Sequence, residues 1–224
     1  MKEKLQVMIL DDHQGIVDGY RYRLGMVPDI EVVAALSYGS TLDLALRENH
    51  VDVLILDVEV PTSPDNPNSY PILHTIPKLL QQYPELMILV ISVHSEPSLI
   101  RAIVNAGATG YILKGDSGRI QELGKWVFRL VKGELCFSEK ALEALVGRKD
   151  SPFTSRQLEA LSLCAAYPNS KTAELARKMK IADSTLRNLL STVYFKLDVQ
   201  TRAAAIAKAR QMGILTPDPT GPPL

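Results

Sequence analysis

The chain has 224 residues, which exceeds the usual size of a single domain and favours two domains. Its composition, 46% hydrophobic and 22% charged, is typical of a folded protein with a real core, and no apolar run approaches the roughly 18 residues of a membrane span. The sequence enters a strand pattern at once, without a signal-peptide pattern, and Cys136 and Cys164 lie far apart. We therefore expect free thiols and a cytoplasmic location.

The charge is unevenly distributed, although the formal net charge is zero. Residues 1–149 hold 15 Lys and Arg against 19 Asp and Glu, whereas residues 150–215 hold 10 against 5. An acidic first part and a basic second part predict that the second domain meets a polyanion.

The first half of the chain alternates between apolar runs and helical patterns. Apolar β-branched runs of this kind predict strands that are buried on both faces of a parallel sheet. The fold class that follows is α/β, a doubly wound five-stranded parallel sheet in a domain of residues 1–132. The predicted strands cover 5–12, 30–36, 51–57, 86–92 and 109–114, and the helices lie near 14–26, 40–48, 71–83, 96–106 and 117–132.

The second half is purely helical, with patterns at 154–166, 171–179, 183–197 and 200–212. We expect residues 133–152 to be a linker with one short helix, and residues 153–214 to be an all-α domain. The tail, residues 215–224, is rich in proline and is expected to be disordered.

The segment PTSPDNPNSYP, residues 61–71, carries four prolines and predicts a surface loop. It follows the strand that ends at Asp57, so two interpretations stay open. The loop is either an insertion without a role, or a lid or docking loop that alters access to Asp57.

Four of the predicted strands end in polar side chains, at the edge where open α/β sheets bind their ligands. Asp11, Asp12 and Asp57 are expected to lie close together there, and carboxylates at such distances repel unless a cation neutralises them. The expected cation is Mg²⁺. Asp57 is the natural nucleophile toward a phosphoryl group, with Lys114 and the Ser92 hydroxyl binding the phosphoryl oxygens.

Four short motifs make the first half similar to a known family. They are ILDDH at 9–13, LDVEVP at 56–61, ISVH at 91–94 and AGATGYILK at 106–114. With them the chain resembles a two-component response regulator of the NarL/FixJ type, in which a flavodoxin-like receiver domain precedes a LuxR-type helix-turn-helix domain. The loop after Pro61 is about half a dozen residues longer than the family pattern.

The resemblance implies roles for individual residues. Asp57 corresponds to the phosphoacceptor, and Asp11 and Asp12 to the metal-binding acids, with the backbone carbonyl of Glu59 completing the metal shell. The switch residues are then Ser92, Lys114 and Tyr111. The implied partners are a sensor histidine kinase, double-stranded DNA and a second copy of the chain, with RNA polymerase as a further candidate.

The pattern at 183–197 predicts a helix with one apolar stripe and an opposite face of short polar side chains. A short connection joins it to the preceding helix, as in a helix-turn-helix. The stretches at 153–161, 172–199 and 201–209 resemble the LuxR-type DNA-binding domain, with 183–197 as the recognition helix. The expected DNA contacts are Thr172, Ser184, Thr185, Arg187, Asn188, Ser191, Thr192 and Lys196.

The favoured interpretation is therefore a DNA-binding transcription regulator that is switched by phosphorylation of Asp57 and is not an enzyme. The alternative is an atypical regulator whose receiver acts as a ligand-binding, protein-binding or dimerisation module without phosphorylation. A hydrolase of the same fold would need a catalytic base near the acids, for which His13 and His94 are the only candidates.

Overall fold

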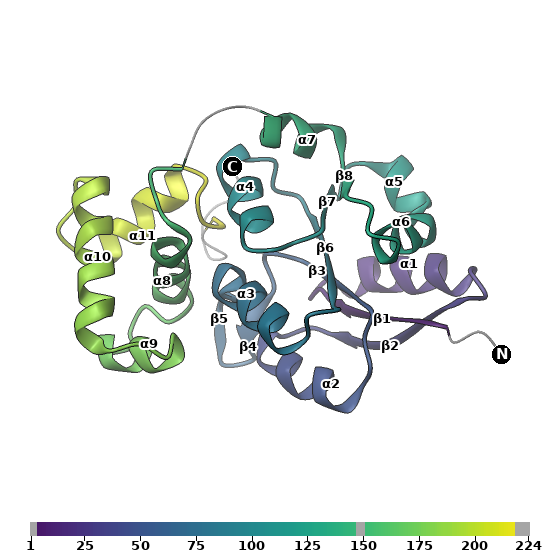
Figure 1. Cartoon of the computed structure of the whole chain (residues 1–224), viewed down its shortest axis with the longest axis horizontal. Coiled ribbons are helices and arrows are strands. Elements are labelled where there is room, and N and C mark those ends of the chain that lie inside the picture. Colours follow the sequence, from purple (N-terminus) through teal and green to yellow (C-terminus); the bar gives the residue numbers. More distant parts are fainter. Residues whose placement is uncertain (1–3, 147–150, 218–224) are drawn as a thin grey trace.

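The computed structural model describes residues 4–146 and 151–217 and divides them into an α/β part and a smaller helical part. Figure 1 shows the helical part beside the helices that cover one face of the sheet, with α8 (Ser155–Ala166) between the other C-terminal helices and the α/β part. The doubly wound parallel fold predicted from the alternating pattern is confirmed.

The sheet has six parallel strands rather than five, in the order β2-β1-β3-β6-β7-β8. The five predicted strands are all present, and the sixth, β8, lies in the segment expected to be a linker. The strand count was wrong because two residues are too few to give a pattern of apolar alternation. The strands are β1 (Leu5–Leu10), β2 (Ile30–Leu36), β3 (Val53–Leu56), β6 (Met87–Ser92), β7 (Gly110–Leu113) and β8 (Cys136–Phe137).

Helices cover both faces of the sheet, and each face has its own apolar layer. One layer packs α1, α5 and α6 against the strands, and the other packs α2, α3 and α4. Burial on both faces explains why β3 is apolar throughout. The helical segments are α1 (Gln14–Gly25), a short 3-10 turn (Gly39–Thr41), α2 (Leu42–Glu48), α3 (Ile72–Gln82), α4 (Pro97–Asn105), α5 (Ser117–Gln121) and α6 (Leu123–Val131).

The segment after α6 packs against the sheet domain. Helix α7 (Glu139–Val146) lies on α4 and β7, with Ala141 and Ala144 buried. Arg101 of α4 donates to the carbonyl oxygen of Ala144 at 2.7 Å. The exact limits of a linker at 133–152 stay a prediction, and residues 147–150 lie outside the described part of the chain.

The proline-rich segment forms an antiparallel hairpin, which corrects the expectation of an irregular surface loop. Its strands are β4 (Pro61–Ser63) and β5 (Asn66–Ser69). Thr62 is buried, and its hydroxyl donates to the carbonyl oxygen of Asn68 at 2.8 Å. Prolines are tolerated because a two-stranded ribbon consists of edge strands, which need few ladder hydrogen bonds.

The C-terminal helices are α8 (Ser155–Ala166), α9 (Thr172–Lys178), α10 (Asp183–Leu197) and α11 (Arg202–Gln211). A capping box between Thr154 and Gln157 begins α8, as Thr-x-x-Gln predicts. Leu215, at the start of the predicted disordered tail, is buried against the core, and residues 218–224 lie outside the described residues.

Helix α10 ends at an unusual residue. Asp198 has a φ of 52°, a left-handed conformation that normally favours glycine. Asp198→Gly is therefore expected to stabilise the protein by about 0.5 to 1 kcal/mol. Equilibrium urea unfolding would show a higher midpoint with an unchanged slope, and Lys180→Gly, at φ 54°, should behave alike. A lower midpoint for both variants would contradict this account.

Among the described helices, none is both long and apolar enough to cross a membrane. Cys136 and Cys164 are both buried and free, as the sequence predicted.

Candidate functional site

The predicted site residues gather at one edge of the sheet, each where a strand ends. Asp11 follows β1, Asp57 follows β3, Ser92 ends β6, and Lys114 follows β7. Asp11, Asp57 and Ser92 are at most 3% exposed. The parallel strands therefore deliver these groups to a single buried rim, as expected for ligand sites of open α/β sheets.

Lys114 joins the two buried carboxylates. Its ammonium Nζ lies 2.8 Å from Oδ2 of Asp11 and 3.0 Å from Oδ2 of Asp57. The other oxygen of Asp57, Oδ1, accepts a hydrogen bond of 2.8 Å from the backbone N–H of Val58. Both oxygens of the central carboxylate are thus held in fixed directions.

Burial and the neighbouring charges set the protonation of this rim. Burial raises the pKa of Asp57, Asp11 raises it further, and Lys114 opposes both effects. For Lys114, burial alone would lower the pKa, but Asp57 and Asp11 outweigh it and raise the pKa. Lys114 therefore stays charged at neutral pH, and an ionised Asp57 depends on it or on another cation.

Four side chains at this rim could hold a cation. Asp11, Asp12, His13 and Asp57 offer ligand atoms that all lie within 4.8 Å of one another. Three of these four residues offer carboxylate oxygens, which suit a hard divalent cation. The position of the Glu59 carbonyl in this shell stays a prediction. His13, whose Nδ1 lies 3.0 Å from Oδ1 of Asp12, was not expected to join the acids.

An ion pair that the sequence did not reveal lies beside the rim. His94 Nε2 is 3.0 Å from Oε1 of Glu59, and this pair lowers the pKa of Glu59. Burial alone would lower the pKa of His94, but Glu59 and Glu96 raise it. Glu59 and His94 each lie two residues after a rim residue, Asp57 and Ser92, and this spacing is the sequence signal that could have revealed the pair.

Tyr111, one of the three expected switch residues, is fully buried. Its hydroxyl donates to the backbone carbonyl of His94 at 2.8 Å. The backbone N–H of His94 in turn donates to Oγ of Ser92 at 3.2 Å. Ser92 and Tyr111 are therefore both hydrogen-bonded to the backbone of His94, and a movement of His94 would change both hydrogen bonds.

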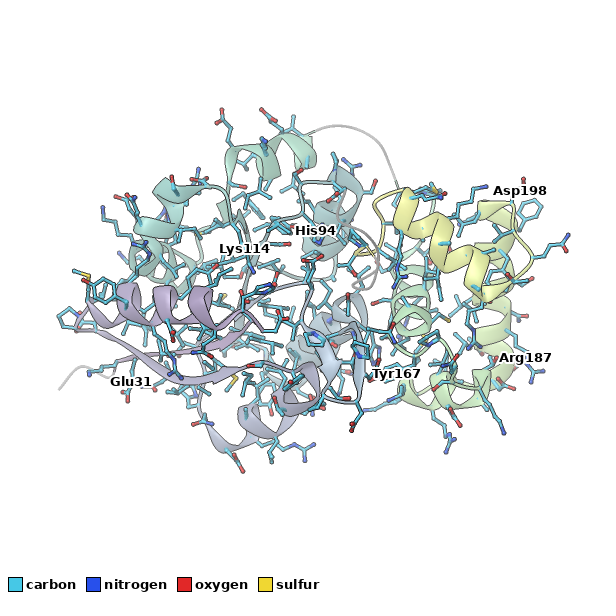
Figure 2. All side chains as sticks on the ribbon, turned by 180° about the vertical axis from the view of Figure 1, so that it is seen from behind. Glu31, His94, Lys114, Tyr167, Arg187 and Asp198 are labelled. Carbon is cyan, nitrogen blue, oxygen red and sulfur yellow. The ribbon has the colours of Figure 1, made fainter. Side chains whose placement is uncertain are left out.

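The expected recognition helix, α10, presents its polar face to solvent. The apolar positions Leu186, Leu190 and Val193 are buried, so the periodicity predicted the orientation correctly. Figure 2 places Arg187 at the outer edge of the helical part, away from His94 and Lys114. The exposed polar residues of this face are Ser184, Thr185, Arg187, Asn188, Ser191 and Thr192.

Four of the expected DNA contacts, Thr172, Arg187, Thr192 and Lys196, have partners within the helical part. The ammonium of Lys196 binds the carbonyl oxygen of Pro152 at 2.6 Å and Oε1 of Gln157 at 2.9 Å. Thr172 is half-buried and accepts a hydrogen bond of 3.1 Å from Arg202. Arg187 forms an ion pair with Asp183 one turn earlier on the exposed face.

Comparison with known proteins shows which family the chain belongs to. The model of the response regulator receiver domain matches residues 7–123, which is more than half of the chain. The chain belongs to the response regulator family. The matched segment contains Asp11, Asp57, Ser92 and Lys114, the residues of the rim described above.

Curated relatives match almost the whole of this response regulator. The nitrate/nitrite response regulator protein NarP of Escherichia coli is 31% identical, with 89% of this chain and 92% of that protein covered. The transcriptional regulatory protein DegU of Brevibacillus brevis is 26% identical, with 95% of each chain covered. RcsB of Salmonella enterica serovar Typhimurium, solved bound to a promoter, has a similar fold, with a TM-score of 0.64, 20% identity and coverage of 92% and 98%.

Proposed function

We propose that this response regulator accepts a phosphoryl group on Asp57 and controls transcription by binding double-stranded DNA through α10. The observation that carries the proposal is the Lys114 ammonium held between two buried carboxylates, because this arrangement keeps a nucleophilic carboxylate ionised beside a cation. The relative DegU, which is named a transcriptional regulatory protein, supports the proposed control of transcription.

The residues of the rim have distinct tasks in this function. An oxygen of Asp57 attacks phosphorus, the bond from phosphorus to the donor's leaving group breaks, and a new P–Oδ bond forms. Lys114 then neutralises oxygens of the bound phosphoryl group, and the Ser92 hydroxyl donates to another. When bound by Asp11, Asp12 and Asp57, Mg²⁺ would supply further charge neutralisation.

The phosphoryl donor is proposed to be a sensor histidine kinase, as in other two-component systems. A second copy of the chain is the proposed partner on DNA, because one small helical module buries too little surface for tight specific binding. Regulation without phosphorylation is the weaker candidate. The gathering of Asp11, Asp57, Ser92 and Lys114 at neighbouring strand ends supports the phosphorylation chemistry instead.

A contact between Arg187 and DNA gives a direct test of the proposed DNA binding. Arg187→Ala is expected to weaken binding to a DNA site selected from a random pool and to lower the slope of log K against log salt by about one unit, since one phosphate contact is lost. Lys125→Ala is the matched control, because that exposed cation pairs with Glu122 at the N-terminal cap of its own helix, as Arg187 pairs with Asp183, but lies on α6, outside the helical part. Equal slopes for wild type and Arg187→Ala would exclude a phosphate contact by Arg187.

A further inference from the structure

The hairpin β4–β5 reaches the DNA-binding part. The side-chain amide of Asn66 donates to the backbone carbonyl oxygen of Ala166 at 3.0 Å. Ala166 is the last residue of α8, and carbonyls in the last turn of a helix lack a partner within the helix. The receiver part therefore caps the C-terminal end of a helix that belongs to the other part.

Helix α8 is buried on nearly all sides, which is more burial than its contacts with α9, α10 and α11 on one face provide. One face contributes Leu161 and Cys164 to the helical core, while polar Glu159 and Ser162 are at most 8% exposed. An amphipathic helix leaves such residues in water unless a second surface covers them. Here α3 and α4 of the receiver provide that surface.

Charge and apolar contacts reinforce this surface. Oε1 of Glu159 lies 2.7 Å from Nδ1 of His74 in α3, and Oε2 accepts a hydrogen bond of 2.7 Å from Arg156. Buried apolar side chains of both parts form one continuous cluster, which includes Leu73, Leu99, Leu158 and Leu215. A continuous core of this kind is typical of parts that move as one body.

The hairpin is firmly attached to the receiver at its other end. The backbone N–H of Tyr70 donates to the carbonyl oxygen of Val60 at 2.8 Å, and the Tyr70 ring packs on Gly39, where a Cβ would lie 2.1 Å from the ring. Burial raises the pKa of Tyr70 to about 12. The base of the hairpin is thus rigid, so its tip can hold Ala166 in place.

We propose that the hairpin of residues 61–69 clasps the DNA-binding helices to the receiver in a docked form that leaves α10 exposed. The docked surface is formed by α8, whereas Arg187 of α10 points outward (Figure 2) and the other polar residues of its face are exposed. The clasp therefore fixes the orientation of the recognition helix and does not mask it. The statement about DNA rests on the proposed function, and the statement about docking does not.

Nuclear magnetic relaxation of backbone amides in the full chain tests the docking. In the wild type, residues 5–131 and 155–211 are expected to share one rotational correlation time. Replacing residues 62–69 with a two-residue turn should give residues 155–211 a shorter time than residues 5–131. Separate times in the wild type, or a shared time in the shortened chain, would overturn the clasp.

Asn66→Asp sharpens this test. A carboxylate cannot donate to Ala166, but it still accepts the bonds that Asn66 Oδ1 receives from Asn68. The docking constant should fall about fivefold, the effect of one lost hydrogen bond, and correlation times should separate in the same direction as in the shortened chain. Asp65→Ala, at the exposed turn of the same hairpin, should match the wild type. Correlation times in Asn66→Asp that match those of Asp65→Ala would overturn the cap.

DNA binding tests whether docking leaves α10 free. The wild type and the shortened chain are expected to bind a single half-site with affinities within about threefold of each other in a mobility-shift titration. An affinity for DNA that is tenfold or more higher in the shortened chain would show that docking masks α10. It would overturn the inference that docking leaves α10 exposed. If neither chain binds DNA, the proposed function and exposed-helix part both fail, while the relaxation result for the clasp stands.

Discussion

Asp57→Asn is expected to abolish the mass increment of one phosphoryl group that wild-type protein gains with acetyl phosphate and Mg²⁺. The amide is not a nucleophile toward phosphorus, and Asp11 and Asp12 lack the central position at the tip of β3. Intact-mass spectrometry after incubation and rapid acid quenching measures the result. Equal labelling of the variant and the wild type would place the phosphoryl group elsewhere.

The same variant should remain folded, which separates lost chemistry from lost structure. Burial raises the pKa of Asp57, so its ionised form costs folding free energy at neutral pH. A neutral amide removes that cost, and Asp57→Asn is expected to be at least as stable as the wild type in urea. Asp12→Asn, which changes an exposed acid of the same cluster, controls for the loss of charge.

The second large effect concerns Lys114. Its replacement with Met leaves Asp11 and Asp57 buried without their common cation, and breaking a buried pair in this way costs about 3 to 5 kcal/mol. We expect a loss of this size in the free energy of unfolding at pH 7.5. Lys78→Met is the matched control, because the pair of Lys78 with Asp43 is exposed and contributes about 1 kcal/mol or less.

The loss of stability in Lys114→Met should depend on pH. Without Lys114, the folded-state pKa of Asp57 rises further above its unfolded value. A group with a raised folded pKa stabilises the fold when it is protonated and loses that contribution as the pH rises. The deficit of Lys114→Met should therefore shrink as the pH falls toward 5, and Mg²⁺ should reduce it at pH 7.5. A deficit that is independent of both would mean that Lys114 acts through packing alone.

Most of the fold and of the rim could be predicted because both depend on local patterns. A buried parallel strand is a short apolar run, and the residue that follows it must lie at the sheet edge, so Asp11, Asp57 and Lys114 were found together. The polar face of α10 was found in the same way, from the spacing of Leu186, Leu190 and Val193.

The features that the sequence did not reveal depend on contacts between distant residues. Asn66 and Ala166 are 100 positions apart, and neither residue type indicates the other. His74 is one of several polar residues on α3, and nothing in the sequence distinguishes it as the partner of Glu159. The sequence predicts that Lys196 is a basic DNA contact. The three-dimensional structure shows that its ammonium binds Pro152 and Gln157 at the start of α8.

The sixth strand determines where this regulator can be divided. Cys136 and Phe137 pair with Gly110 and Tyr111, and α7 covers the adjoining apolar surface. A chimaera that joins a foreign effector after residue 132 would leave the β7 edge unpaired and able to template intermolecular strand pairing. A junction after Val146 would transfer the strand and helix with their receiver, so we expect that chimaera to be the soluble one.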